Sequence, residues 1–511
     1  MFVQRFAARA AMNSIAREGL QAPTVPVRGR QAPASCRCPR APVRRRPDFQ
    51  AASSPRRAAL ALSVAAGLLL ALDVQAAIVF TVDSTADGLD DDVSDGICHT
   101  AANNCSLRAA VMQANRTPNA GATIMLPAGT YPLTRPPSGA DAEDSGDLNL
   151  DFPSGVDTGP TTIIGAGAAV TIIDGLGQDR VLRVAVARIA NISGVSMING
   201  VASFSSGGGI LDAGALTLSD SRIFNCEATP LIGNNGQGGG IYVDSGASLS
   251  MNRVAVDQNR ALYGGGIYDT GLLTISQSAI TGNHGGGSAG GVFAAYVTLI
   301  DGTTISGNVA ESGLGGGVLN TNQLIATNTT VSQNSATTFG GGMFNSGTAN
   351  VYNMTVVYNQ ADSDADSSGD GAGIYNSPDE TFNLHNSVVA GNYLAGEPAY
   401  DDCVGALGIY GTDKFSGTPG CVPAAGSTGT ATYIDSLNEL GSLQNNGGPT
   451  KTVALLPPSA LIGGAVDCID GNSGRLRTDQ RGRQRPPTGN RCDVGAFEYN
   501  ELFAGGFELP P

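Results

Sequence analysis

GGGIYDTGLLTISQSAITGN, residues 264–283, is one copy of a phrase that the sequence writes seven times. Its glycine-rich start recurs at 207, 238, 289, 315, 340 and 371, so successive copies lie 31, 26, 25, 26, 25 and 31 residues apart. A nearly fixed period of this length is typical of stacked units, each of which is one supersecondary structure. The sequence therefore predicts a solenoid rather than a chain folded around one globular core.

Each copy combines short runs of alternating β-forming residues with polar breaks and shows no helical period. We therefore expect three short strands per unit. The predicted fold class is all-β: a right-handed parallel β-helix with three strands per rung of about 25 residues. This is a solenoid similar to that of the pectate lyases, and a short N-terminal helix is expected to cap it.

Equivalent residues of stacked rungs lie above one another, so aligned copies separate the side chains into columns. An aliphatic column is expected in the core: Ile210, Ile241, Ile267, Val292, Val318, Met343 and Ile374. Because side chains alternate along a strand, the next column is expected to face outward: Leu211, Tyr242, Tyr268, Phe293, Leu319, Phe344 and Tyr375. A polar column is expected at the following turn: Asp212, Asp269, Asn320, Asn345 and Asn376.

A column of asparagines closes the units: Asn225, Asn259, Asn283, Asn308, Asn334, Asn359 and Asn392. Asparagine tolerates the left-handed conformation and bonds to neighbouring backbone, so a ladder of asparagines is expected. The two 31-residue steps are expected to add loops on one side of the solenoid, and one such loop is ADSDADSSGDG at 361–371.

Five segments are expected along the chain. They are a basic extension with a signal peptide (1–77), an N-terminal cap (78–121), the β-helix (122–400), a C-terminal region (401–499) and a tail (500–511). The apolar run at 58–72 follows an Arg-Arg pair, which fits general secretion and also permits twin-arginine export. In the cap, Leu107, Ala110, Val111 and Ala114 form one apolar helix face.

The predicted mature chain is strongly acidic. Removing residues 1–77 leaves 17 of the 29 basic and 41 of the 44 acidic side chains, a net charge of −24. Such a surface repels nucleic acids and acidic polysaccharides. We expect no membrane span in the mature chain, because the apolar run lies in the signal.

Seven cysteines remain after the signal. Export permits disulfides, and closeness along the chain suggests Cys98 with Cys105, Cys403 with Cys421, and Cys468 with Cys492, although sequence alone does not fix connectivity. The leftover Cys226 is expected to be a buried, inert thiol.

The segment DSTADGLDDDVSDGICHTAANNCSLRAAVMQAN at 83–115 resembles the CSLREA domain of secreted bacterial β-helix proteins, with Ala109 in place of the motif's Glu. NNGGPTKTVALLPPSALIGGA at 445 and TDQRGRQRPPTGNRCDVGAFEY at 478 resemble the choice-of-anchor Q domain. The repeats are also similar to those of chlamydial polymorphic outer-membrane proteins. These resemblances imply a secreted or cell-surface protein, associated with an outer membrane, without an established catalytic residue. The tail ELFAGGFELPP resembles short GFE-type tails and is either a sorting tag or a plain end.

Catalytic signals are sparse in the sequence. Rungs 261–413 contain no Lys or Arg, which a uronate lyase needs. A glycosidase needs two carboxylates, for which Asp244 and Asp269 on neighbouring rungs are candidates. His284 is a lone histidine beside glycines and is expected to be a satisfied or solvent-exposed imidazole.

Calcium is the expected cofactor, if there is one. Asp362, Asp364, Asp366 and Asp370 cluster on a loop, as do Asp90, Asp91, Asp92 and Asp95, and oxygen ligands suit this ion. Each cluster can equally be a solvated turn.

The aromatic column (Tyr242, Tyr268, Phe293, Phe344 and Tyr375) is either a platform for neutral sugars or a stack that stabilises the sheet. The function expected from the sequence is an exported, non-catalytic scaffold for adhesion or matrix binding, with a surface glycan or protein as partner. The alternative is a carbohydrate-active enzyme, a glycoside hydrolase or an esterase-like protein, acting on a neutral polysaccharide.

Overall fold

A computed structural model of the chain describes residues 78–499, except 118–120, 139–141, 152–158, 204, 230–235, 417–419, 435, 471–473 and 487–490. These residues belong to one compact unit, Leu72–Pro511. The predicted signal peptide and tail lie outside the described residues. Among the described residues, no helix has the length and apolar character required to cross a bilayer.

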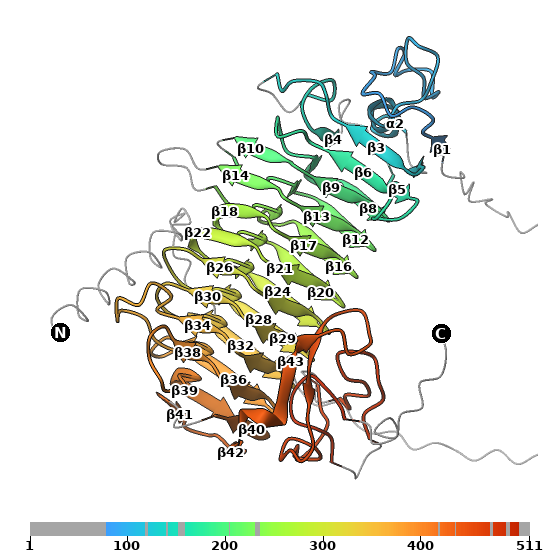
Figure 1. Cartoon of the computed structure of the whole chain (residues 1–511). Helices are drawn as coiled ribbons and strands as arrows, with labels where there is room; N and C mark the ends of the chain where they lie inside the picture. Colours follow the sequence, from blue (N-terminus) through green and yellow to red (C-terminus); the bar gives the residue numbers. More distant parts are fainter. Residues whose placement is uncertain are drawn as a thin grey trace, which may run out of the picture. The chain divides into compact units, whose positions relative to one another are not determined.

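The described chain winds into a right-handed parallel β-helix whose strands form long ladders (Figure 1). Ladder 1a, which follows the glycine phrases, consists of β4 (Leu148–Leu150), β7 (Leu182–Val184), β11 (Ile210–Asp212), β15 (Ile241–Val243), β19 (Ile267–Asp269), β23 (Val292–Ala294), β27 (Val318–Asn320), β31 (Met343–Asn345), β35 (Ile374–Asn376), β39 (Cys403–Ile409) and β41 (Gly420–Pro423). Ladder 1b consists of β1 (Ile78–Thr81), β2 (Ala122–Leu126), β5 (Thr161–Gly165), β8 (Ile189–Ser193), β12 (Ala215–Ser219), β16 (Ser248–Asn252), β20 (Leu272–Ser276), β24 (Val297–Asp301), β28 (Gln323–Thr327), β32 (Thr348–Tyr352) and β36 (Thr381–His385), and it also reaches β39.

Two further parallel sheets complete each rung. Sheet 2 consists of β3 (Gly129–Pro132), β6 (Thr171–Asp174), β9 (Ser196–Ile198), β13 (Arg222–Phe224), β17 (Ala255–Asp257), β21 (Ala279–Thr281), β25 (Thr304–Ser306), β29 (Thr330–Ser332), β33 (Thr355–Val357), β37 (Val388–Ala390), β40 (Thr412–Phe415) and β42 (Thr430–Tyr433). Sheet 3 consists of β10 (Val201–Ser203), β14 (Glu227–Thr229), β18 (Arg260–Tyr263), β22 (His284–Ser288), β26 (Val309–Ala310), β30 (Ser335–Ala336), β34 (Gln360–Ala361) and β38 (Tyr393–Leu394).

The number of strands per rung differs from the prediction. A repeat contributes four short strands, because a turn such as the one at Ala213 and Gly214 separates the strands of ladders 1a and 1b. Both ladders belong to one 22-stranded sheet, so the rung has three sheets and four strands. The boundaries also differ: β1 already pairs with β2, and β39 to β42 extend the solenoid past residue 400.

The aliphatic column is confirmed as core. Its members pair rung by rung and are no more than 2 % exposed. Burial of one such side chain stabilises the fold by about 1.5–3 kcal/mol relative to exposure. The polar column is buried rather than set in a surface turn, and Asn320 donates to Asn345, which donates to Asn376, over 2.7 Å each. These amides satisfy one another inside the solenoid.

The N-terminal end is covered by α2 (Leu107–Ala114), which packs against β2 and β4 (Figure 1). Ser106 caps the helix by accepting from the Ala109 N–H. All eight helical residues are buried, including Arg108, which pairs with Asp87 over 2.6 Å. The predicted apolar face is thus confirmed, and the segment before the helix covers its other side.

The C-terminal lobe, residues 437–499, lies against the outer face of sheet 2 beside the later rungs (Figure 1). It contains η1 (Leu437–Glu439) and the antiparallel pair β43 (Leu440–Gln444) and β44 (Thr452–Leu455). Gln480 donates to Thr304 Oγ1 over 2.9 Å and accepts from Thr330 Oγ1 over 2.6 Å. Val357 and Val388 of sheet 2 also share an apolar cluster with the lobe.

The three expected disulfides are present: Cys98 with Cys105, Cys403 with Cys421, and Cys468 with Cys492. Cys226 is a buried free thiol, and burial raises its pKa to about 12. A thiol with so high a pKa is a poor nucleophile, which fits the structural role expected for it.

Candidate functional site

A sharp corner between sheets 2 and 3 forms a groove on the described surface. The corner residue adopts positive φ on successive rungs: 54° at Asn199, 54° at Asn225, 56° at Gln258 and 62° at Gly282. Short polar residues and glycine are the ones that tolerate this conformation. The turn leaves a concavity of about 570 Å³ that runs across these rungs.

The inner side of the corner is an asparagine ladder. Asn308 Oδ1 accepts from the backbone N–H and the side-chain amide of Asn283, over 3.0 and 2.9 Å. Its own amide donates to Asn334 Oδ1 and to the Ile280 carbonyl, each over 2.9 Å. The six members Asn259, Asn283, Asn308, Asn334, Asn359 and Asn392 are fully buried. The predicted ladder is therefore confirmed for these positions.

The two ends of the ladder hold other residues. Asn225 was expected to belong to it but lies one position earlier, exposed at the corner, and Cys226 stands in the ladder. The Cys226 N–H donates to Asn259 Oδ1 over 2.9 Å. At the other end, Asn392 donates to Asp402, and burial raises the pKa of this carboxyl to about 7.

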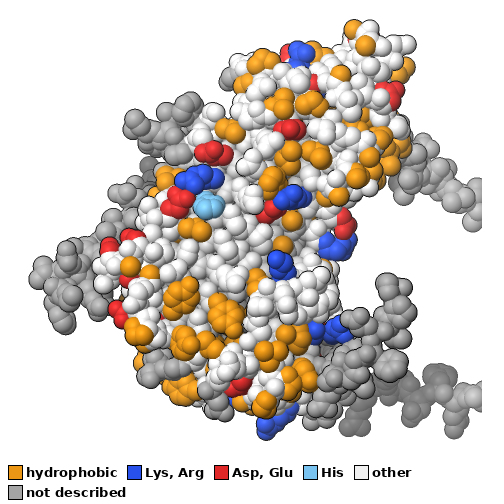
Figure 2. Space-filling view, viewed as in Figure 1, with side chains coloured by type: hydrophobic (Ala, Val, Ile, Leu, Met, Phe, Trp, Pro, Cys, Tyr) orange, Lys and Arg blue, Asp and Glu red, His pale blue; other side chains and the backbone are white. Residues whose placement is uncertain are grey.

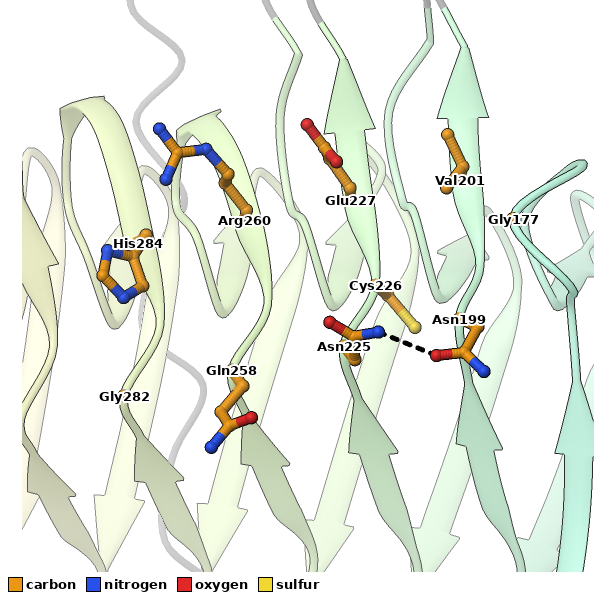
Figure 3. A pocket seen from close by; sticks show the side chains of 10 residues that line it. All are labelled: Gly177, Asn199, Val201, Asn225, Cys226, Glu227, Gln258, Arg260, Gly282 and His284. Atoms are coloured by element: carbon orange, nitrogen blue, oxygen red, sulfur yellow. Dashed lines mark hydrogen bonds between the residues drawn. The ribbon is translucent and has the colours of Figure 1, made fainter.

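The outer side of the corner carries two parallel rows of side chains (Figure 3). The first row contains the corner residues themselves, and Asn225 donates to Asn199 Oδ1 over 2.8 Å. The second row opens the strands of sheet 3, where Val201, Glu227, Arg260 and His284 are in register on adjacent strands. Figure 3 shows these rows on either side of the buried Cys226. The groove is thus lined by amides along one side and mainly by charged groups along the other.

Arg260 and His284 of the second row share a partner, Glu311, with which they form a charged trio. Arg260 binds Glu311 through both terminal nitrogens, over 2.8 and 2.7 Å, and His284 Nδ1 lies 3.2 Å from Glu311 Oε1. The hydrogen bond from Arg260 lowers the pKa of Glu311, and the same bond raises the pKa of Arg260. Half of the Arg260 side chain (52 %) remains exposed. The trio therefore offers donors to a ligand while its two main charges offset each other.

The sequence did not predict this trio, because His284 is a lone histidine beside glycines and neither Arg260 nor Glu311 belongs to a recognised motif. Part of the signal was present, because Arg260 directly follows Asn259 and His284 directly follows Asn283 in the ladder, whereas Glu311 lies three residues after Asn308. Aligning the position after the ladder across the repeats would have brought Arg260 and His284 together, but not Glu311.

The catalytic candidates lie elsewhere. Asp269 is fully buried and accepts from Thr298 Oγ1 over 2.8 Å and from the Gly271 N–H over 3.0 Å. Burial raises its pKa to about 7. Asp244 is half-buried in a turn of ladder 1a, where it accepts from the Ser245 N–H. A carboxyl enclosed like that of Asp269 has no open approach for a glycan.

The aromatic column forms a stack along ladder 1a. Ring centroids are 5.7 Å apart for Tyr242 and Tyr268, 4.5 Å for Tyr268 and Phe293, and 5.2 Å for Phe344 and Tyr375. On most strands the column lies on the less buried side, opposite the core column, as predicted, but its side chains are largely covered: Phe344 and Leu319 are each 4 % exposed and the other members are half-buried. This packing corresponds to the stabilising alternative, in which neighbouring rings cover one another.

The two acidic clusters differ in structure. Carboxylate oxygens of Asp362, Asp364 and Asp366 lie within 4.8 Å of one another, and Asp370 is not part of this group. Asp362 already accepts from the Ser367 and Ser368 N–H groups. These oxygen donors have the chemistry that calcium prefers, so a calcium ion at this loop stays a prediction.

At the second acidic cluster the protein supplies its own donor. The buried Gln113 amide donates to Asp90 Oδ1 over 2.9 Å and approaches the carbonyls of Asp92 and Ile97 at 3.0 Å each. His99 pairs with Asp91. The centre of this loop is therefore filled by a side chain, which a cation would have to displace.

Comparison with known proteins gives a distant likeness of fold. The crystal structure of pectate lyase Pel9A shares 15 % sequence identity with this chain. The match spans 84 % of this chain and 98 % of the pectate lyase chain, with a TM-score of 0.39. A likeness this distant carries no information on activity. No family model and no curated protein matches the chain, so the CSLREA-type and choice-of-anchor Q-type identifications stay predictions.

Proposed function

We propose that this chain is an exported, non-catalytic β-helical scaffold that binds a neutral surface polysaccharide in the corner groove. The observation that carries the proposal is the groove itself: a concavity of about 570 Å³ that carries polar side chains spaced one rung apart. A ligand with a similar repeat of polar groups is a polymer of sugars. The parallel rows favour a chain that lies along the solenoid axis.

The chemistry of the groove suits hydroxyl groups. Asn225 and Gln258 offer both amide donors and carbonyl acceptors, and Arg260 keeps N–H groups beyond those bound to Glu311. The charge of Arg260 is offset by Glu311, so the groove presents no free cation for a uronate. The surface view in Figure 2 shows side chains of both charges, in red and blue, among uncharged and hydrophobic ones on this face.

Binding is favoured over hydrolysis by the state of the carboxyls. A glycosidase needs a protonated acid with a raised pKa beside a second carboxylate. Among the groove-lining residues the carboxyl is that of Glu227, and the pKa of Glu311, the partner of Arg260, is lowered by their hydrogen bond. Carboxyls with pKa values raised to about 7, such as Asp212, Asp269 and Asp413, are buried inside the solenoid.

Export to the cell surface or the medium is part of the proposal. Three disulfides support it, because such bonds persist in oxidising compartments. The resemblance of the two ends to CSLREA-type and choice-of-anchor Q-type segments implies the same location. A regular solenoid with disulfides near both ends is a suitable rigid scaffold for adhesion.

The test is a glycan array run beside a reducing-sugar assay on the same polysaccharides, using the full chain. We expect binding of neutral polysaccharides without release of reducing ends. Release of sugar ends would show that the alternative, a carbohydrate-active enzyme, is correct. Absence of binding to every glycan would refute the proposal.

A matched pair of variants locates the binding. Arg260→Ala removes the central donor and is expected to weaken glycan binding about tenfold, the loss of one strong hydrogen-bonding group. Arg253→Ala is the control, because Arg253 forms a similarly exposed pair, with Asp220, outside the groove. Equal binding by both variants would place the ligand elsewhere.

A further inference from the structure

The second row of the groove continues beyond the concavity along sheet 3. His284 pairs with Val309, Val309 with Ser335, Ser335 with Gln360, and Gln360 with Tyr393. None of the three intervening side chains carries a charge. The row therefore leads from the charged trio across an uncharged stretch to a tyrosine.

Three tyrosines meet at the far end of this row. Tyr393 and Tyr400 are 40 % and 45 % exposed and lie opposite each other in an antiparallel bridge. Tyr358 occupies the corner position with φ of 59°, and its hydroxyl donates to the Gly441 carbonyl of the C-terminal lobe over 3.4 Å. Burial, and secondarily the neighbouring Tyr400, raises the pKa of Tyr358, which fits this proximity.

The surface view agrees with this placement. Hydrophobic side chains gather over the region that Figure 1 assigns to β34 and β38 (Figure 2). Two exposed tyrosines opposite each other offer a ring surface, and each combines an apolar ring with a polar tip. Sugar rings stack on such surfaces through their apolar faces.

The spacing sets the size of ligand that would reach both places. Four inter-strand steps separate His284 from Tyr393, and at about 4.8 Å per step this is about 19 Å along the axis. A disaccharide is too short to touch both ends. A linear oligosaccharide of several units spans the distance without turning.

We infer that Tyr393 and Tyr400 form a second subsite, which stacks on a sugar of the same polysaccharide chain that the groove binds. The inference rests on the proposed function and specifies its ligand: a linear neutral glycan that runs along sheet 3. The acidic chain disfavours a polyanion, since its formal net charge is −15 even with its basic N-terminal segment.

Titration calorimetry with oligosaccharides of increasing length tests the subsite. Cello-, xylo- and manno-oligosaccharides from disaccharide to octasaccharide are titrated into the full chain. Wild type is expected to bind the octasaccharide of its preferred series at least about tenfold more tightly than the trisaccharide, because one stacking contact is worth about that much. The double variant Tyr393→Ala/Tyr400→Ala should lose this gain and keep its trisaccharide affinity.

Two controls separate the possible failures. Tyr296→Ala removes a tyrosine that is 50 % exposed in a turn of another face and should leave the length dependence unchanged. Tyr393→Phe/Tyr400→Phe should retain most of the gain, because stacking uses the ring. If the double alanine variant keeps the full gain, the tyrosine subsite is wrong while the groove stands. If wild type binds no oligosaccharide of any length, both proposals fall.

Discussion

The inner and outer sides of one corner show how this chain separates stability from recognition. On the inner side, six consecutive rungs place the same residue, asparagine, in the same hydrogen-bonding role, and all six are fully buried. One residue further along, the outer side carries Arg260, His284, Val309, Ser335, Gln360 and Tyr393 on the same rungs. The inner row repeats because an unsatisfied buried amide is costly, whereas the outer row is free of that constraint.

The same comparison holds for the carboxyl groups. Inside, burial raises the pKa of Asp402 and of Asp413 to about 7. Outside, Arg260 lowers the pKa of Glu311. The inner acids thus make a pH-dependent contribution to stability. The outer acid, Glu311, is an ionised group that holds the donor Arg260 in place.

The largest expected effect comes from breaking the inner row in its middle. Asn308→Ala leaves the backbone and side-chain N–H groups of Asn283 without their acceptor, so we expect a loss of about 3 kcal/mol in the free energy of unfolding. Chemical denaturation measures it. The control is Gln333→Ala, an exposed corner position one residue before a ladder asparagine, where the change should stay below about 0.5 kcal/mol. Equal effects would contradict the division between the two sides.

The second prediction concerns the pH dependence of stability. A carboxyl whose pKa is about 7 in the folded state, against an ordinary value of 3.8, binds more protons in the folded state. Its stabilising contribution is therefore complete below pH 3.8 and is lost as the pH rises toward 7. We expect a higher melting temperature at pH 5 than at pH 8.

Asp413→Asn isolates the contribution of one inner acid. Asp413 Oδ1 accepts from the Ser387 N–H over 2.7 Å, and an amide oxygen can take over this bond. The variant should be more stable than wild type at pH 8. Its melting temperature should differ less between pH 5 and pH 8 than that of wild type. If the variant shows the same difference in melting temperature as wild type, Asp413 does not contribute to the pH dependence of stability.

The third prediction concerns the end of the ladder, where a substitution can extend the row of asparagines by one member. Cys226 occupies an asparagine position, and the Gly200 N–H donates to its sulfur over 3.4 Å. Cys226→Asn offers this N–H a better acceptor and adds a donor toward Asn259, so we expect stabilisation of about 1 kcal/mol. A matched Cys226→Ser variant, whose side chain is too short to continue the ladder, should show no gain. Destabilisation by asparagine would mean that the first rungs do not share the geometry of the later ones.

The smallest expected effect concerns the loop at 361–371, which lies outside both rows. If Asp362, Asp364 and Asp366 bind calcium, adding a chelator should lower the melting temperature of wild type by a few degrees and leave Asp364→Asn unaffected. Asp95→Asn is the comparison at the other acidic loop, where Gln113 already supplies a donor. Identical melting curves for wild type with calcium and with chelator would refute the site.

The sequence was most informative where burial constrains residue type. The aliphatic column and six of the seven asparagines were predicted in place, because only a few residue types suit a repeated buried position. Asn225 was misplaced by one residue, since asparagine also suits the left-handed corner that precedes the ladder. The trio of Arg260, His284 and Glu311 was missed because its members come from three rungs and share no residue type.

The structure of the complex with a bound octasaccharide tests the central claim most directly. The account predicts sugar units along the outer side of the corner, hydrogen-bonded to Arg260 and stacked on Tyr393, with the asparagine ladder unchanged beneath them. Sugar bound instead to the aromatic column of ladder 1a, or to the loop at 361–371, would contradict it.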